Sequence, residues 1–435
     1  MSLMQRVANA GSLLESKVDL PLVFDVAMLR DDVYKYLSAQ EIANLVSSDE
    51  RRARSEISSA CNKVFEEQEW QNCSSQEQQN LRDLLLDSIF GLGPLENMLE
   101  DQSISEIMVN GTRSIYFEKN GNLYKSEQRF TSEEQLRSLI DRIIGPLGRR
   151  CDEACPIVNG RLANGHRVHA IIPPLAIDGP ILTIRKFTEE LIKLEDMLKL
   201  NSIDSKLLQF LSWMIKSRKN IAVSGGTGTG KTTLLNALSC KIALNERIIT
   251  IEDCAELRFF EHPHVLRLEA RTKNAEGVGE VSIRDLVITA LRMRPDRIVV
   301  GECRSEEALD MLQAMNTGHD GSLTTLHANN PKDAIVRLTS MVRFASDLPV
   351  EVIENNIASA IDLIIQLKRD VSGKRYVSEL AVLKAIEGDA NPINTIYVRK
   401  YVQDAGTWSD NISLLDEIIE KHIASAEEVS SWQAA

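Results

Sequence analysis

The 435-residue sequence predicts an α/β fold in which helices cover both faces of a mostly parallel sheet. The first observation is an alternation between residues 205 and 380, where apolar runs of strand length are separated by stretches of helical character. The second is that these runs are almost continuously apolar, as buried parallel strands are. They lie at residues 221–223, 248–251, 298–300 and 323–326.

The chain before this region divides into four segments. Residues 1–40 lack sustained periodicity, so we expect a flexible N-terminus. Residues 41–100 carry apolar residues at helical spacing and predict a small helical bundle. In residues 101–186, strand-like runs and turn signals such as Asn110-Gly111 predict a mixed α/β domain. The charged, helical residues 187–204 are expected to link it to the last domain.

The last predicted domain spans residues 205–435 and ends in a C-terminal tail. The tail has a hairpin signal around residues 389–394 and a final acidic helix. We find no internal repeat and no low-complexity segment.

Composition narrows the class of protein. The net charge is −13, so phosphate backbones repel the chain and we expect no nucleic-acid partner. The 7 cysteines are scattered without a zinc-site spacing, which indicates reduced thiols in a reducing compartment. No signal segment opens the chain and no apolar run reaches the roughly 18 residues of a spanning helix. We therefore expect a cytoplasmic protein without direct membrane insertion, which reaches a membrane only through partners.

The strongest chemical signal is a G-x-x-x-x-G-K-[ST] motif between a predicted strand and a predicted helix. Glycines let backbone N–H groups surround phosphates, and the following helix adds its positive end. Lys231 would bind the β and γ phosphates, and the Thr232 hydroxyl would bind Mg²⁺. The predicted ATP-binding residues are Gly225, Gly226, Thr227, Gly228, Thr229, Gly230, Lys231, Thr232 and Thr233. The alternative, a glycine-rich turn that matches by chance, is disfavoured because both the strand and the helix are present.

Two further predicted strands end in carboxylates, at the sheet edge where ligands bind. Glu302 follows the run 298–300 and can orient the attacking water or hold Mg²⁺ through water. Many P-loop enzymes have Asp where this chain has Gly301, which leaves Glu302 as the candidate. Glu252 and Asp253 end the run 248–251 and can also position water or metal. Exposed carboxylates at strand ends, or solvated caps, are the alternative readings.

His327 closes the run 323–326, where it could donate to the γ-phosphate and sense its loss. A single histidine is more often structural or merely exposed. Arginines such as Arg161, Arg167 and Arg185 could stabilise charge on a transferred phosphoryl group, often from a neighbouring subunit. Most arginines, however, form surface salt bridges or solvated faces.

Taken together, residues 92–368 resemble the type II/type IV secretion ATPase superfamily, and within it most closely the CpaF-like proteins of the tight-adherence (Tad/Flp) pilus branch. The aspartate box, the Walker B strand and the histidine box follow the P-loop in the family's order. The matching segments are Gly93-Pro94-Leu95-Glu96, residues 105–111, 170–175 and 182–187, Thr250-Ile251-Glu252-Asp253, residues 293–302 and residues 317–329.

The resemblance implies a homo-hexameric ring of two-domain subunits, with ATP between an N-terminal PAS-like domain and a RecA-like C-terminal domain. It implies that Glu302 is the catalytic carboxylate and that His327 senses the phosphate. It also implies that Arg161 and Arg167 reach the nucleotide across the ring. By the same resemblance, Lys231 and Glu252 join Glu302 and His327 in catalysis.

We therefore expect a hexameric ATPase that drives assembly, or retraction, of a type IV/Tad pilus, or protein secretion across the inner membrane. Its partners would be inner-membrane platform proteins. A type IV secretion or conjugation ATPase is the alternative within the superfamily. A RecA-like nucleic-acid motor and a nucleotide switch with little turnover are more distant alternatives. The acidic composition disfavours the first of these two, and Glu302 disfavours the second.

Overall fold

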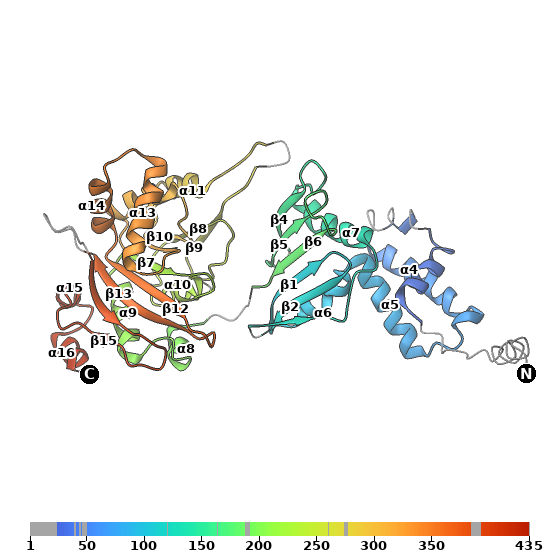
Figure 1. Ribbon diagram of the computed structural model, residues 1–435, viewed down its shortest axis with the longest axis horizontal. Coiled ribbons are helices and arrows are strands. Elements are labelled where there is room, and N and C mark those ends of the chain that lie inside the picture. The colour runs from blue at the N-terminus through green and yellow to red at the C-terminus, as the bar shows by residue number, and fades with distance from the viewer. Residues whose placement is uncertain are drawn as a thin grey trace, which may run out of the picture. The chain divides into compact units, whose positions relative to one another are not determined.

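The computed structural model describes residues 24–38, 41–42, 45, 50–119, 121–162, 164–187, 192–259, 261–273, 277–383 and 393–434. The chain forms two compact units (Figure 1). The first contains residues 1–147 and 151–186, and the second contains residues 148–150 and 187–435.

The first unit begins with packed helices. They are α2 (Val26–Val33), α4 (Glu50–Phe65), η1 (Gln68–Trp70) and α5 (Ser75–Phe90). Asp25 caps α2 by accepting a hydrogen bond from the Met28 N–H at 2.8 Å, and Leu29 is fully buried among α4 and α5. The prediction of a flexible N-terminus over residues 1–40 is therefore wrong for the residues of α2. Leu29 packs into the apolar core of this helical part, and that packing holds the helix in place. Residues 1–23 lie outside the described part.

The same unit continues as a six-stranded antiparallel sheet in the order β3-β2-β1-β6-β5-β4. Helix α7 covers it with five buried aliphatic side chains, after a cap in which Ser132 accepts from the Gln135 N–H. At the predicted Asn-Gly turn, Gly111 has φ +59°. The elements are η2 (Gly93–Leu95), α6 (Glu96–Glu100), β1 (Ile104–Asn110), β2 (Ser114–Lys119), β3 (Asn122–Lys125), α7 (Glu133–Ile144), η3 (Gly145–Leu147), β4 (Ile157–Arg161), β5 (Arg167–Ile171) and β6 (Ile181–Arg185).

The second unit contains a nine-stranded sheet in the order β15-β14-β13-β12-β7-β11-β10-β8-β9. The strands from β12 to β9 in this order are parallel, and β13, β14 and β15 add an antiparallel edge. The strands are β7 (Ile221–Gly225), β8 (Ile248–Glu252), β9 (Val265–Glu269), β10 (Arg297–Val300), β11 (Leu323–Leu326), β12 (Leu363–Arg369), β13 (Arg375–Leu383), β14 (Ile393–Val398) and β15 (Thr407–Trp408). The predicted α/β class with a mostly parallel, RecA-like sheet is confirmed.

Helices cover both faces of this sheet. Ile221 and Val223 of β7 join one core, and Ala222 between them joins the other, because successive strand residues point to opposite faces. The first core includes α8 (Leu194–Lys199), α9 (Ser205–Lys216), α10 (Lys231–Ser239), α15 (Leu414–Glu420) and α16 (Ala426–Ala434). The second includes α11 (Ile283–Ala290), α12 (Glu307–Asn316), α13 (Pro331–Ala345) and α14 (Val350–Ala360).

Two segments differ from the pattern that the sequence indicates. The segment 187–204, expected to be a linker, contains α8, whose Leu194 and Met197 are buried in the first core of the second unit. Beyond residue 381, β14 pairs with β13 and extends the sheet, while the turn of the predicted hairpin lies mostly outside the described residues. None of the helices in the described ranges combines the length and the apolar composition that a membrane span needs.

Candidate nucleotide-binding site

The P-loop follows β7, a central and fully buried strand of the second unit. Gly228 and Gly230 have φ values of +69° and +93°, which side chains with a Cβ rarely adopt. A Cβ on Gly225 would lie 2.5 Å from Thr229 Oγ1, so only glycine fits there. Helix α10 then begins at Lys231, and Thr232 and Thr233 lie in its first turn. A glycine loop followed by a helix N-terminus is an arrangement suited to binding phosphate groups.

Lys231 lies beneath the loop with its ammonium group held by backbone carbonyls. Its Nζ donates to the carbonyl oxygens of Gly226 at 2.9 Å and Gly225 at 3.1 Å, and lies 3.4 Å from His327 Nδ1. Burial lowers the pKa of Lys231, while the charge of Glu302 opposes that shift. Within the described residues, no carboxylate is within ion-pair distance of Nζ. The side chain therefore carries a positive charge with no anionic partner.

Glu302, His327 and Arg304 lie together at the ends of β10 and β11. Glu302 Oε1 is 2.9 Å from His327 Nε2, at ion-pair distance but without hydrogen-bond alignment. Its other oxygen, Oε2, accepts a hydrogen bond from Arg304 Nη2 at 2.6 Å. Strand pairing in parallel register brings Lys231, Glu302 and His327 to one edge of the sheet. The two strand-end residues singled out from the sequence are therefore in direct proximity.

The charge states of Glu302 and His327 follow from this arrangement. Burial alone would raise the pKa of Glu302, but the hydrogen bond and charge of Arg304, with His327 and Lys231, hold it below its usual value. Burial and then the charge of Lys231 lower the pKa of His327. At neutral pH the site therefore has an ionised carboxylate beside a neutral imidazole.

Glu252 lies at the end of β8 and is buried. Its Oε1 accepts hydrogen bonds from the N–H groups of Glu256 at 2.8 Å and Leu257 at 2.9 Å. Its Oε2 has no hydrogen-bond partner in the described part of the chain, and burial raises the pKa of the carboxyl group to about 7. A Cβ on Gly301 would lie 2.6 Å from Glu252 Cγ. Glu252 occupies the space that a side chain at position 301 would need, which explains the glycine there.

Arg304 was not singled out from the sequence, although it lies only two residues after Glu302. It also reaches Asp253, with 3.3 Å between Nη1 and Oδ2. A single guanidinium group thus joins the carboxylates that end two neighbouring strands. The sequence does contain a signal for this residue, because Arg304 is a cation close to the acidic end of a predicted strand. Its second partner, Asp253, could not be predicted, because that contact depends on the pairing of β8 with β10.

The site fits ATP with Mg²⁺ in its donor set. The glycine loop supplies N–H groups, Lys231 has no carboxylate partner among the residues that the structure describes, and the Thr232 hydroxyl lies at the start of α10. The buried Oε2 of Glu252 accepts no hydrogen bond from the described residues, so this oxygen has the character of a metal ligand. Hydroxyl and carboxylate oxygens are the ligands that Mg²⁺ prefers.

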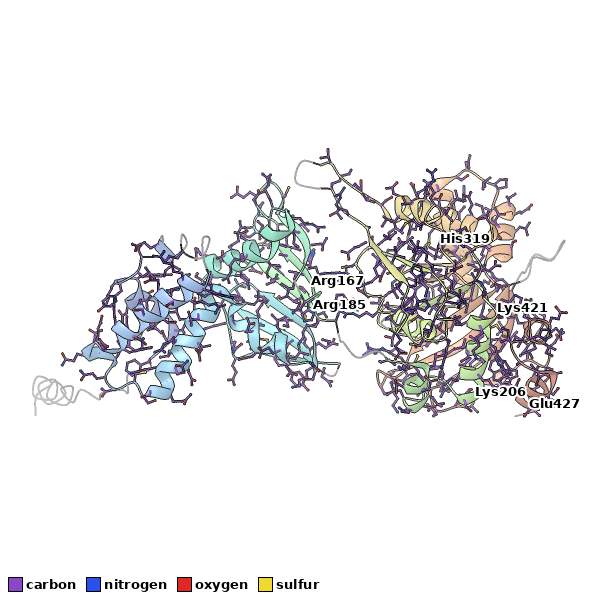
Figure 2. The ribbon with its side chains drawn as sticks, turned by 180° about the vertical axis from the view of Figure 1, so that it is seen from behind. Arg167, Arg185, Lys206, His319, Lys421 and Glu427 are labelled. Carbon is purple, nitrogen blue, oxygen red and sulfur yellow. The ribbon has the colours of Figure 1, made fainter. Side chains whose placement is uncertain are left out.

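Arg161 and Arg167 belong to the first unit, whereas the P-loop, Glu302 and His327 belong to the second. They are register partners on β4 and β5, and Arg167 is also the register partner of Arg185 on β6. Figure 2 shows Arg167 and Arg185 beside each other at one end of the sheet. Three arginines therefore form a row across adjacent strands, and their role stays a prediction.

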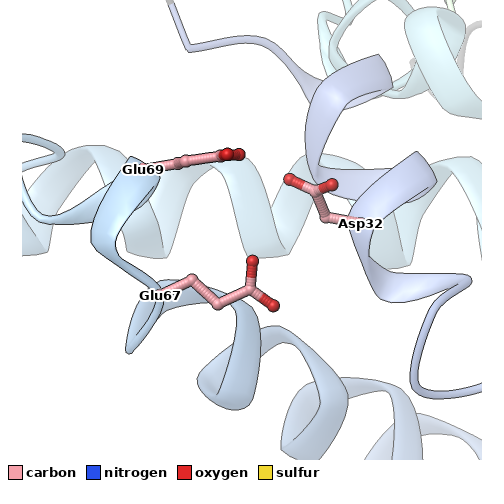
Figure 3. A group of neighbouring side chains, drawn as sticks. All are labelled: Asp32, Glu67 and Glu69. Carbon is pink, nitrogen blue, oxygen red and sulfur yellow. The ribbon is translucent and has the colours of Figure 1, made fainter.

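An acidic group in the helical part of the first unit has a structural explanation. Oxygen atoms of Asp32, Glu67 and Glu69 lie within 4.8 Å of one another (Figure 3). Asp32 already pairs with Lys35 at 2.6 Å and accepts from Trp70 Nε1 at 2.8 Å. We assign no metal to it.

A parallel sheet with this loop, lysine and strand-end carboxylates defines a P-loop nucleotide-binding protein. The family model described as "Type II/IV secretion system protein" matches residues 89–400, and the chain belongs to this family. The predicted resemblance to type II/type IV secretion ATPases is confirmed at this level.

Several relatives are similar over most of their length. A Mycobacterium tuberculosis protein with the provisional name conjugal transfer protein Rv3659c is 36% identical over 331 residues, which are 75% of this chain and 93% of that protein. The type IV secretion system protein VirB11 of Bartonella quintana is 31% identical over 326 residues, or 66% of this chain and 91% of the relative. The X-ray structure of the ATPase DotB of Yersinia pseudotuberculosis matches with a TM-score of 0.50 and 17% identity, covering 67% of this chain and 78% of that one. This last match supports the fold alone.

The names of these relatives refer to conjugal transfer and type IV secretion. Family membership supports ATPase activity in a secretion system. The comparisons do not single out the tight-adherence pilus branch that the sequence resembles.

Proposed function

We propose that this chain is an ATPase whose hydrolysis of ATP drives a secretion or pilus-assembly machine at the inner membrane. The observation that carries the proposal is the meeting of Lys231, Glu302 and His327 at one sheet edge beside the P-loop. A protein that only binds nucleotide has no need for an ionised carboxylate beside the phosphate-binding lysine.

Each residue has a role that follows from its surroundings. The P-loop N–H groups and Lys231 would bind the β and γ phosphates, and the Thr232 hydroxyl at the start of α10 would bind Mg²⁺. When bound, Mg²⁺ neutralises charge on the phosphates. Glu302 is ionised and can orient water and accept its proton. His327 is neutral and contacts both Lys231 and Glu302, so a change in either one alters its environment.

Glu252 has a pKa of about 7 and can therefore hold or release a proton near neutral pH. We assign it to the catalytic set as the group that exchanges a proton or binds the metal through Oε2. Arg304 positions Glu302 by its hydrogen bond of 2.6 Å.

We further propose a homo-hexameric ring in which Arg161 and Arg167 reach the nucleotide of a neighbouring subunit. Their alignment across β4 and β5 supports this role, because a row of guanidinium groups has the geometry to bind phosphate oxygens. The ring would be cytoplasmic and would act through inner-membrane platform proteins, without nucleic acid as a partner.

The process that the ATPase drives has two candidates. The sequence motifs favour assembly or retraction of a Tad pilus. The names of the relatives refer to conjugal transfer and type IV secretion, so a type IV secretion or conjugation ATPase fits the comparisons equally well. Genes for pilin and prepilin peptidase beside this gene would support the former, and genes for conjugation coupling proteins would support the latter.

The test is steady-state ATPase activity of the full chain beside Glu302→Gln, with the size of both measured in ATP. We expect turnover to fall about 100-fold or more in the variant while ATP binding persists, because a positioned general base contributes about 10² to 10⁴. Glu351→Gln, at an exposed position in α14, is the matched control and should hydrolyse ATP normally. Unchanged turnover in Glu302→Gln would exclude Glu302 from catalysis, and a wild type that binds ATP without turnover would indicate a switch.

A further inference from the structure

The hairpin formed by β12 and β13 lies next to the P-loop. Leu367 of β12 is the register partner of Gly225 of β7, so β12 continues beyond the point where β7 ends. Its last residue, Arg369, is the register partner of Arg375, the first residue of β13. Two arginines from a distant part of the sequence are thereby placed at the level of the phosphate-binding loop.

The turn between these arginines has a defined conformation. Asp370 accepts hydrogen bonds from the Lys374 N–H at 2.9 Å and from the Ser372 hydroxyl at 2.7 Å. These bonds, that of Ser372 first, lower the pKa of Asp370, so its carboxylate stays ionised and keeps the turn closed. Gly373 has φ +88°, which a tight turn needs. The two arginines are therefore held opposite each other.

Arg375 contacts the P-loop, and Arg369 lies close to it. Arg375 Nε donates a hydrogen bond to the carbonyl oxygen of Gly228 at 2.9 Å. A Cβ on Gly230 would lie 3.4 Å from Arg375 Cδ, and a Cβ on Gly228 would lie 3.8 Å from Arg369 Nη1. Because Arg375 uses Nε for the carbonyl, its two Nη groups remain for another acceptor.

The charges in this region lack a counterion. Neither Arg369 nor Arg375 forms an ion pair among the described residues, and Lys231 lies under the same loop. Like charges directly opposite on neighbouring strands repel each other. A bound polyphosphate would supply the missing negative charge, and guanidinium groups bind phosphate through paired N–H donors.

We propose that Arg369 and Arg375 bind the phosphates of the nucleotide from above the P-loop of their own subunit. This rests on the proposed nucleotide site, and it adds two binding residues in cis to the P-loop lysine below. The hairpin thus places positive charge over the P-loop, and its contribution to affinity comes from the phosphates of the nucleotide and not from the base.

The test is equilibrium binding of ATP with Mg²⁺ to the full chain, with Arg369→Gln, Arg375→Gln and the double variant. We expect each single change to raise the Kd about 10-fold, as loss of a charged hydrogen-bonded contact does, and the double change to raise it further. Lys374→Gln removes the same charge from the same hairpin, at a residue with no contact to the P-loop glycines, and should stay within about twofold of wild type. Inorganic tripolyphosphate, used as a competitor, should lose affinity in parallel with ATP.

Arg369→Gln is the decisive variant because Arg369 makes no hydrogen bond to the loop, so its loss leaves the loop conformation in place. Unchanged affinity in Arg369→Gln would overturn the two-arginine proposal even if Arg375→Gln is weakened. Lys231→Ala separates this proposal from the proposed function. If Lys231→Ala loses ATP and the hairpin variants do not, only the hairpin proposal fails. If wild type fails to bind ATP, both fail.

Discussion

At the scale of single residues, the contact between Glu252 and Gly301 explains a departure from the usual P-loop pattern. Many P-loop enzymes place Asp at position 301, but here a side chain would collide with Glu252 Cγ. Glu252 takes the vacated space and is removed from water. The candidate carboxylates of this site are therefore Glu252, at the end of β8, and Glu302, two residues after the end of β10.

The raised pKa of Glu252 predicts a dependence of stability on pH. Between its ordinary value of 4.5 and about 7, the folded chain keeps the Glu252 proton and the unfolded chain releases it. The free energy of unfolding should therefore fall as pH rises through this range, by on the order of 3 kcal/mol. Glu252→Gln keeps the Oε1 acceptor without the charge, so its stability should change less between pH 5 and pH 8.

Urea unfolding of both proteins across this pH range, without nucleotide, measures the effect. Glu351→Gln should retain the wild-type slope because Glu351 is exposed. A Glu252→Gln variant that loses as much stability as wild type would show that Glu252 is ionised in the folded protein.

At the scale of elements, the C-terminal tail is part of the nucleotide-binding unit. Trp432 of α16 lies 4.8 Å from Trp408 of β15 and 5.8 Å from Phe210 of α9, measured between ring centroids. Its Nε1 also donates to the Lys206 carbonyl oxygen at 2.8 Å. In Figure 2, Lys206 of α9 and Glu427 of α16 mark the two helices joined in this way.

Trp432→Ala should therefore destabilise the second unit by about 3 to 5 kcal/mol, as deletion of a buried aromatic side chain does. The measurement is the midpoint of chemical unfolding. Ser431→Ala, at the exposed neighbouring position, should change it little. A tail that folds apart from the sheet would give equal midpoints for both variants.

At the scale of the whole molecule, each apolar core lies within one unit. Both cores of the second unit are built from residues 192–432, and those of the first unit from residues 24–184. A unit that contains its own core can fold alone. The fragment 187–435 should therefore unfold cooperatively and bind ATP with Mg²⁺.

The fragment 205–435, which begins at the boundary expected from the sequence, is the matched comparison. It lacks α8 and the buried side chains of Leu194, Met197 and Ile203, so the core that they cover is exposed to water, which should cost several kcal/mol. Thermal unfolding followed by circular dichroism compares the two. Equal stability would place α8 outside the folded unit.

The arrangement of the candidate nucleotide site could be predicted in large part because its signals are local. The P-loop glycines, Lys231 and Thr232 form one continuous motif between a strand and a helix. Glu302 and His327 each end a short apolar run, and the ends of parallel strands meet at one edge. Helix α2, the role of α8 and the place of the tail could not be predicted, because each depends on apolar contacts with residues far away in sequence.

The sequence by itself determined the class of fold, the phosphate-binding loop and the strand-end residues. These features depend on local periodicity and on the backbone conformations that glycine allows, and both are properties of residues that are close together in the sequence. Only the tertiary structure decided that Arg304 joins Glu302 to Asp253, and that Arg369 and Arg375 lie over a loop some 140 residues earlier in the chain. These contacts result from strand order, which is set by the burial of whole strands against one another.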